Sequence, residues 1–449
     1  MILLSFRMLN KYQVCYNDCA AYCPQPSLIL EGEKFPMSIL KRLLPDIRDW
    51  SRKIPWKGIR AVLLAFIVTR LLIFAAIYLS MAEMITALRT GDIYWRAVPQ
   101  NILADGLIRW DSRYYIDIAL HGYTAMATAF FPLYPLLVRI LYIVVGHHFL
   151  VCGLLVSNLM FIVTLAYLYA LVHQEYDDEA ASRAVFYLAA APAAFAFSAM
   201  YSESVLLAFL IACFYYARNG RWFLAAIMGA AASAARVPGV LAAVFILLEA
   251  LWRQGIRFFP KPWSWKAQLD LIQKNIHLVP GTWPGILAAA GSTTGLLAYM
   301  LYLNITFHDP LSFIHQQTIW SRQLRWDWFT RLFTNTFQQL NLGGNFWAGQ
   351  INVNLLQDVS ATLIFLPLVI TVMLKMRPSF GAFTFLAFLI PLLSSTVFSM
   401  RRLTLTLVPC FILLGVWGRR PWLDRIIVGI SLAFQVYLAI LFSHWDFAG

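Results

Sequence analysis

Long apolar runs, separated by short polar segments, recur along the chain. The first run, residues 60–82, is long enough to cross a bilayer as a helix of about 20 residues. The later runs share its scarcity of charge, and they cover residues 131–149, 150–173, 184–200, 204–217, 222–252, 283–303, 355–374, 380–399, 403–418 and 424–443. We therefore expect an all-α polytopic membrane protein, with roughly 9–11 transmembrane helices and a large first external loop.

Two of these runs leave the number of crossings open. The run 131–149 is interrupted by Pro132 and Pro135, and 222–252 is short for two full crossings. In one arrangement, 131–149 is an external membrane-embedded helix and 222–252 is a hairpin broken at residues 236–239. In the other, each run crosses once.

The composition agrees with a membrane protein. Sixty per cent of the 449 residues are hydrophobic and only 13% are charged, whereas soluble proteins carry about 25% charged residues. Soluble enzymes, DNA-binding factors and disordered scaffolds are thereby excluded. A transmembrane β-barrel is excluded because the apolar runs are long and continuous.

The charge distribution predicts the orientation. The net charge is +13, which we attribute to cytoplasmic loops that contact anionic membrane lipids; no nucleic-acid partner is expected. A basic cluster before the first run places the N-terminus in the cytoplasm, and it comprises Lys41, Arg42, Arg48, Arg52, Lys53, Lys57 and Arg60. In the hairpin arrangement the external segments are 83–149, 201–204, 236–239, 304–354 and 400–402, and residues 253–281 form an interfacial segment at the cytoplasmic face.

Residues 1–36 differ in composition from the rest of the chain, and the sequence from Met37 onwards resembles a more natural N-terminus. We interpret 1–36 as an N-terminal extension of uncertain function and 37–449 as a single polytopic membrane domain. The extension holds Cys15, Cys19 and Cys23, whose spacing matches none of the usual zinc patterns, so no metal is expected. The remaining cysteines, Cys152, Cys213 and Cys410, lie in apolar runs and are expected to be buried.

The densest external group of polar and aromatic residues is "RWDSRYYIDIALHGY" at 109–123. If residues 111–121 are helical, one face carries Asp111, Tyr114, Tyr115, Ile118 and His121. A carboxylate held between aromatic rings at the membrane interface is suited to act as a general base. The alternative is an interfacial helix with an aromatic belt.

Four further charged residues interrupt apolar sequence. Because charge is costly in or beside a membrane, each is expected to have a structural or functional role. Glu203 lies between two runs, where it is either a site residue or part of a helix cap that starts at Ser202. Arg236 lies among Ala and Val and is expected to face a partner, a cavity or a lipid phosphate. Arg401 and Arg402 lie at an external junction, where the alternative is contact with lipid headgroups.

These residues belong to segments that resemble, in order, the PIG-V family, the second mannosyltransferase of GPI-anchor assembly, and its bacterial relatives. The segments are "RWDSRYYIDIALHGY" (109–123), "FFPLYPLL" (130–137), "YSES" (201–204), "ARVPGV" (235–240), "FHDPLSFIHQQTIWSR" (307–322) and "SMRRLTLTLVPCFILL" (399–414). The chain departs from the family pattern at Ala235, where Thr is frequent, and at His308, where Gly is usual.

The resemblance implies a GT-C type integral-membrane glycosyltransferase. Such an enzyme moves a sugar, here mannose, from a polyprenyl- or dolichyl-phosphate donor to a lipid-linked glycan acceptor, with inversion, on the non-cytoplasmic face. It needs no cofactor. The membrane would be a bacterial plasma membrane, or the endoplasmic reticulum membrane in a eukaryote.

The resemblance carries the family's motif positions over onto Trp110 and Asp111, onto Glu203 and Arg236, and onto one of the two arginines Arg401 and Arg402. Asp111 is the expected general base, and the expected substrate-binding residues are Arg109, Trp110, Tyr114, His121, Glu203, Arg236, Arg401 and Arg402. Motifs for soluble nucleotide substrates are missing from the sequence, which agrees with a lipid-linked donor. The alternatives are a lipid or solute transporter or flippase, which would use the same charged residues as a pathway, and a non-enzymatic membrane scaffold.

Overall fold

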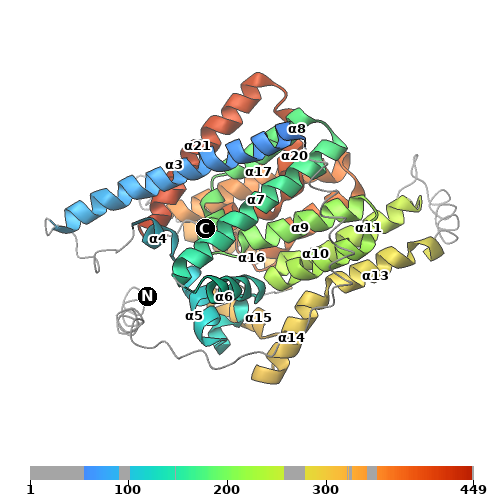
Figure 1. Ribbon diagram of the computed structural model, residues 1–449, viewed down its shortest axis with the longest axis horizontal. Coiled ribbons are helices and arrows are strands. Elements are labelled where there is room, and N and C mark those ends of the chain that lie inside the picture. The colour runs from blue at the N-terminus through green and yellow to red at the C-terminus, as the bar shows by residue number, and fades with distance from the viewer. Residues whose placement is uncertain are drawn as a thin grey trace. The chain divides into compact units, whose positions relative to one another are not determined.

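The computed structural model describes residues 55–89, 102–146, 148–256, 279–320, 322, 326–340 and 351–446. Helices occur throughout these ranges and strands in none of them (Figure 1). The predicted all-α fold class is therefore confirmed. The predictions for residues 1–36 and their cysteines, and for most of the segment 253–281, concern residues outside the described ranges.

Among the described residues, five helical segments are long and apolar enough to cross a membrane. They are α3 (Trp56–Arg89), α7 (Phe149–Glu175), α13 (Trp283–Ser292) continued by α14 (Thr294–Phe307), α17 (Val353–Lys375) and α21 (Pro421–Ser443). A sixth is formed by α19 (Met400–Leu403) and η6 (Thr404–Thr406) together with α20 (Val408–Trp417), which are bent by 80°. The predicted integral, multi-pass membrane protein is confirmed.

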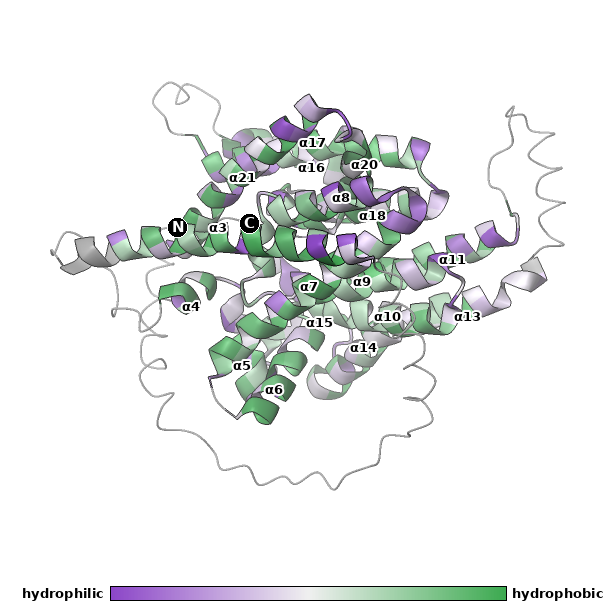
Figure 2. Cartoon of the chain, turned by 45° about the horizontal axis from the view of Figure 1, so that its top comes forward, coloured by the Kyte–Doolittle hydropathy of each residue, from purple (hydrophilic) through white to green (hydrophobic). Residues whose placement is uncertain are grey.

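Shorter helices complete the bundle, and the predicted number of crossings is reached only when some of these are counted. They are α4 (Ile102–Leu107), α5 (Ser112–His121), η1 (Ala125–Ala129), α6 (Leu133–Val145), α8 (Asp178–Ala190), η2 (Ala194–Phe197), α9 (Glu203–Arg218), α10 (Trp222–Ala235), η3 (Val237–Leu241), α11 (Ala242–Arg253), η4 (Val279–Thr282), α15 (Ser312–His315), η5 (Gln316–Trp320), α16 (Trp328–Leu340) and α18 (Pro378–Leu392). Figure 2 shows α3 and α6 as largely hydrophobic. The cysteines Cys152, Cys213 and Cys410 are buried, as predicted.

The broken hairpin expected around residues 236–239 is present. Arg236 ends α10 in an extended conformation, with φ −166° and ψ 161°, and Pro238 follows in η3. The chain then returns as α11, and both α10 and α11 pack against α13. At 1.5 Å per residue, helices of 14 and 12 residues extend only about 20 Å. The hairpin therefore brings Arg236 back among the helices at its tip.

Gly239 is required where this hairpin turns. A Cβ atom at this position would overlap the carbonyl group of Ala232 and lie 2.7 Å from the backbone nitrogen of Ser233. We expect Gly239→Ala to destabilise the protein by about 3 kcal/mol or more, because backbone atoms cannot move aside as a side chain does. Thermal unfolding of the purified protein measures this change.

The matched control is Gly429→Ala on α21, where a Cβ atom would meet no atom within 4 Å. That substitution is expected to leave the unfolding temperature unchanged or to raise it, because Ala favours helix more than Gly does. Equal unfolding temperatures for the two variants would contradict the packing argument.

A buried arginine on α3 supports the segment that leads to Glu203. The guanidinium of Arg70 donates hydrogen bonds to the carbonyls of Ala194 at 2.8 Å and Ala189 at 2.9 Å, and to Ser198 Oγ at 3.0 Å. These carbonyls lie at and beyond the end of α8, where no further helical turn satisfies them. Gln435 of α21 donates a second bond to the Ala189 carbonyl at 2.8 Å. The sequence analysis did not single out Arg70.

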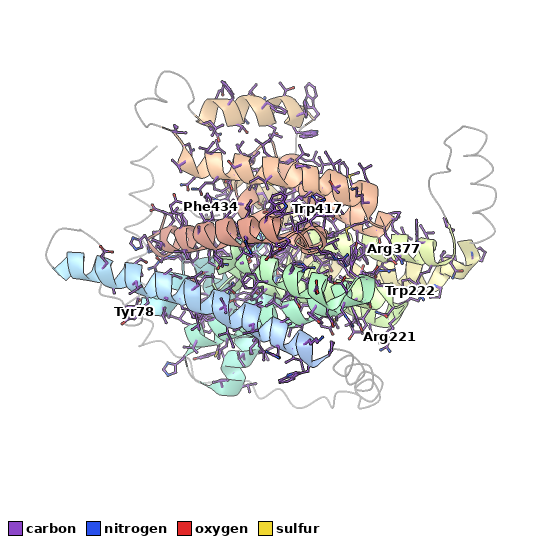
Figure 3. All side chains as sticks on the ribbon, turned by 90° about the horizontal axis from the view of Figure 1, so that it is seen from above. Tyr78, Arg221, Trp222, Arg377, Trp417 and Phe434 are labelled. Atoms are coloured by element: carbon purple, nitrogen blue, oxygen red, sulfur yellow. The ribbon has the colours of Figure 1, made fainter. Side chains whose placement is uncertain are left out.

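Charged residues also meet at the end of the bundle that is predicted to face the cytoplasm. Arg218, at the end of α9, pairs with Glu175 at 2.5 Å and with the buried Glu249 at 2.8 Å. Arg377, before α18, lies 3.9 Å from Glu249. Figure 3 labels Arg377 and Arg221 towards one side of the molecule, away from Tyr78. These ion pairs join α7, α9, α11 and α18.

Candidate functional site

Four charged residues from distant parts of the chain form one cluster. Arg402 Nη1 lies 2.8 Å from Asp111 Oδ2, and Arg402 Nε lies 3.5 Å from Glu203 Oε1. Arg236 Nη1 forms a close ion pair with the same oxygen of Glu203. We call these residues, Asp111, Glu203, Arg236 and Arg402, the charged cluster. It lies at the end of the bundle that is predicted to be external.

A strained turn presents Asp111 to this cluster. Trp110 has a φ angle of 49°, in the left-handed region that a bulky residue rarely adopts. Its ring packs edge-on against Trp445 at 6.0 Å, and Arg109 Nε donates to the carbonyl of Ser443 at 3.0 Å. The end of α21 therefore holds the turn in place. Such strain is frequent at functional sites.

Glu203 faces the charged cluster and does not act as part of a helix cap. It is the first residue of α9, and its side chain is 3% exposed. Ser202 makes no capping hydrogen bond; its hydroxyl is bonded to Tyr115 Oη at 2.7 Å. The capping interpretation is therefore not supported, and the two arginines neutralise the buried carboxylate.

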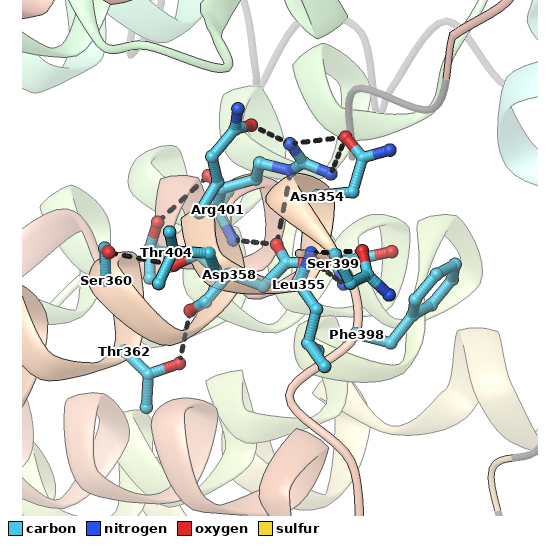
Figure 4. A network of polar contacts seen from close by, with 12 residues as sticks. Asn354, Leu355, Asp358, Ser360, Thr362, Phe398, Ser399, Arg401 and Thr404 are labelled. Carbon is cyan, nitrogen blue, oxygen red and sulfur yellow. Dashed lines mark hydrogen bonds and ion pairs between the residues drawn. The ribbon is translucent and has the colours of Figure 1, made fainter. Parts of the chain in front are cut away.

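The adjacent arginines, Arg401 and Arg402, have different partners. Arg402 faces Asp111 and Glu203, whereas Arg401 Nε lies 3.3 Å from Asp358 of α17. Asp358 also accepts hydrogen bonds from the backbone N–H groups of Ser399 at 3.0 Å and Arg401 at 3.1 Å (Figure 4). Both arginines are buried, so the alternative interpretation, in which they contact lipid headgroups, is not supported.

Asp358 therefore holds the short helix that carries Arg402. We expect Asp358→Asn to lower the unfolding temperature by several degrees, because a neutral amide leaves the buried charge of Arg401 without its counterion. The substitution is also expected to displace Arg402 from Asp111 and Glu203. Asn354→Ala on the same helix is the matched control, because its contacts with Arg401 are long, 3.4 and 3.5 Å. An Asp358→Asn protein as stable as the control would show that Asp358 does not hold the helix of Arg402 in place.

The structure separates some residues that the sequence analysis grouped together. His121 ends α5 about 15 Å along the helix from Asp111, is exposed, and acts electrostatically on Asp117. Partial burial raises the pKa of the Asp117 carboxyl, and His121 and Arg113 oppose that shift. Tyr114 stacks on Phe130 at 4.4 Å, one helix position before the buried Tyr115.

Sequence analysis did not single out two residues next to the charged cluster. One is Asp358, which could have been recognised from the sequence because it is a lone acidic residue within an apolar run. The other is Arg322, which ends the segment 307–322 and whose Nη2 donates to the Phe398 carbonyl at 2.9 Å. Burial, followed by the positive charges of Arg402 and Arg236, lowers the pKa of Arg322 to about 10. Arg322 is therefore charged at neutral pH. Within the described ranges, no three His, Cys, Asp or Glu residues are grouped as metal ligands.

Comparison with known families gives a match over less than half of the chain. The family model described as "Mannosyltransferase (PIG-V)" matches residues 59–261, which contain Asp111, Glu203 and Arg236. This match bears out, within these residues, the predicted resemblance to the PIG-V family. Arg402 and Arg322 lie beyond the part of the chain that the PIG-V family model matches.

Among solved structures, the chain is similar to the oligosaccharyltransferase of Archaeoglobus fulgidus. The complex with zinc and sulfate has a TM-score of 0.41 and 12% identity, with 85% of this chain and 53% of that chain covered. The apo form has a TM-score of 0.42 and 12% identity, with 88% and 56% covered. The chain thus spans about half the length of these structures. A search of curated proteins found no match.

Proposed function

We propose that the protein transfers mannose from a polyprenyl-phosphate donor to a hydroxyl group of a lipid-linked glycan, on the non-cytoplasmic face of the membrane and with inversion. The observation that carries this proposal is the contact between Asp111 and Arg402 in a chain whose residues 59–261 match a mannosyltransferase family model. It combines a carboxylate that can accept a proton with a guanidinium that can bind a phosphate.

In the proposed reaction, Asp111 takes the proton of the acceptor hydroxyl. The acceptor oxygen then forms a bond to the anomeric carbon while the bond from that carbon to the phosphate oxygen breaks. Polyprenyl phosphate leaves with the electron pair of that bond. The Asp111 side chain is 23% exposed, so an acceptor can reach it, and Arg402 orients its carboxylate.

The leaving group needs stabilisation of charge more than it needs a proton, because it is already a phosphate. Arg236 and Arg402 can supply this stabilisation through guanidinium N–H groups, which match the geometry of phosphate oxygens. Glu203 links these two arginines, because it accepts a hydrogen bond from Arg236 and forms an ion pair with Arg402 at 3.5 Å. The cluster therefore places the proposed base and the proposed phosphate ligands together.

The position of the cluster supports an enzyme over a transporter. Asp111 and Glu203 lie at the first turns of α5 and α9, and Arg402 lies in the short helix before α20. A transport pathway usually places its charged residues near the middle of the membrane, between repeats. The cluster instead lies at helix ends that are predicted to be external.

Sugar transfer by the purified full-length protein in proteoliposomes tests the proposal. The donor is radiolabelled polyprenyl-phosphate mannose, and the acceptor is a crude lipid extract. We expect a labelled glycolipid whose new linkage has the opposite anomeric configuration to the donor. A folded protein that neither binds the donor nor transfers mannose, but moves lipid or solute across the bilayer, would contradict the proposal and favour a transporter.

A further inference from the structure

A third guanidinium, that of Arg322, lies next to the charged cluster without a carboxylate of its own. Its hydrogen bond goes to the neutral Phe398 carbonyl, and its carbon Cζ lies 6.0 Å from the centre of the Phe398 ring. In the described part of the chain, no acidic side chain lies within 4 Å of it. Its Nε–H donor is buried and has no partner there.

The charges around Arg322 do not balance. Asp111 and Glu203 supply two negative charges, which Arg236 and Arg402 already match. Asp358 already forms an ion pair with Arg401 and accepts hydrogen bonds from two backbone N–H groups. Among the residues that the structure describes, Arg322 therefore leaves one positive charge in excess, and the fields of Arg402 and Arg236 act against it. A bound anion would remove this repulsion and satisfy the buried donor.

The segment that carries Arg322 also carries an aromatic residue two positions earlier. Trp320 packs edge-on against Phe130 at 5.7 Å and against Tyr114 at 6.0 Å, and Tyr114 lies three positions after Asp111. Aromatic rings and an excess positive charge in one region can bind a molecule that has an anionic head and a hydrocarbon chain.

We infer that Arg322 binds the phosphate of a prenyl-linked phosphate, as a third guanidinium alongside Arg402 and Arg236. The inference rests on the proposed function, and it adds a ligand from a segment outside the part matched by the PIG-V family model. Arg322 would hold the negative charge that the departing phosphate retains, while Arg402 also orients Asp111.

Direct binding of polyprenyl phosphate, without sugar, to the full-length protein tests the inference. The variants are Arg322→Gln and Arg322→Lys, and the control is Arg331→Gln on α16, an exposed arginine paired with Asp327. We expect Arg322→Gln to weaken binding about 10- to 100-fold, which corresponds to one lost hydrogen bond to a charged group. Arg331→Gln should bind within about twofold of the wild type.

Uncharged polyprenol is the second probe, because it has the same chain without the phosphate. Its affinity should be the same in the wild type and in both Arg322 variants. An equal loss for both probes, or unchanged binding of polyprenyl phosphate by Arg322→Gln, would overturn the inference. If Arg322→Gln fails to fold, Arg322→Lys serves as the test of the inference. A lysine keeps the positive charge but cannot make the bidentate hydrogen bonds of a guanidinium to a phosphate. Its binding of polyprenyl phosphate must then fall at least about threefold, with polyprenol unaffected.

These measurements need no sugar transfer, so they separate the two proposals. Phosphate-specific binding that depends on Arg322, in a protein that transfers no sugar, would leave the inference standing and remove the proposed function. Sugar transfer by a protein whose affinity for polyprenyl phosphate does not depend on Arg322 would support the proposed function and overturn the inference.

Discussion

Asp111→Asn is expected to lower kcat for mannose transfer by at least about 100-fold, the usual contribution of a general base. The amide has nearly the same shape but accepts no proton from the acceptor. The protein should remain folded, because Arg402 keeps its contact with Glu203. The KM for the donor should be unchanged or lower, since the loss of one negative charge makes the cluster more attractive to a phosphate.

Initial rates at varied donor concentration measure both constants. The matched control is Asp117→Asn, which removes a carboxylate from the same helix, α5, six positions further along on the exposed side. The control should transfer mannose at nearly the rate of the wild type. Near-normal kcat for Asp111→Asn, or an equal loss in both variants, would refute the assignment of Asp111 as the base.

Arg402→Gln is expected to affect both activity and stability. It removes a guanidinium that contacts Asp111 and Glu203, so the almost fully buried Glu203 carboxylate keeps Arg236 as its remaining ion-pair partner. Breaking a buried ion pair costs about 3–5 kcal/mol. Transfer should fall about 100- to 1,000-fold, as when one donor to a developing negative charge is removed from an active site.

The neighbouring substitution, Arg401→Gln, separates these two effects. Arg401 is also buried and ion-paired, but its partner is Asp358 on α17. We expect a similar loss in unfolding temperature with a much smaller loss of transfer. The double variant Asp111→Asn with Arg402→Gln should recover part of the stability, because both ends of one ion pair are then neutral, and none of the activity. Equal transfer rates for Arg401→Gln and Arg402→Gln would contradict the proposed role of Arg402.

The sequence allowed prediction of the features that depend on local pattern. Long apolar runs predicted the helices, and the Pro-Gly pair after Arg236 predicted the broken hairpin, because both follow from neighbouring residues. The polar residues Asp111, Glu203 and Arg236 were singled out because charge is costly beside a membrane. The structure brings these three into one cluster.

Features that depend on distant contacts could not be predicted in this way. The partner of Arg402 is 291 positions away, and nothing near residues 401 and 402 distinguishes the two arginines. Asp358 has its role because of backbone groups 41 and 43 positions away. His121 was grouped with Asp111 by helical period alone, and the distance along the axis separates them. Each case requires the packing of helices that are remote in sequence.

The bonds of Arg70 have a consequence for the order in which the chain enters the membrane. Its acceptors at Ala189 and Ala194 follow 119 and 124 positions later. At about 5–20 residues per second, a ribosome needs about 6–25 s to supply them. During that interval α3 holds an unpaired charge that costs about 3 kcal/mol in the bilayer. We therefore expect α3 to be fully stabilised only after α8 has emerged, and a nascent chain arrested before residue 189 to be more susceptible to membrane proteases than a longer one.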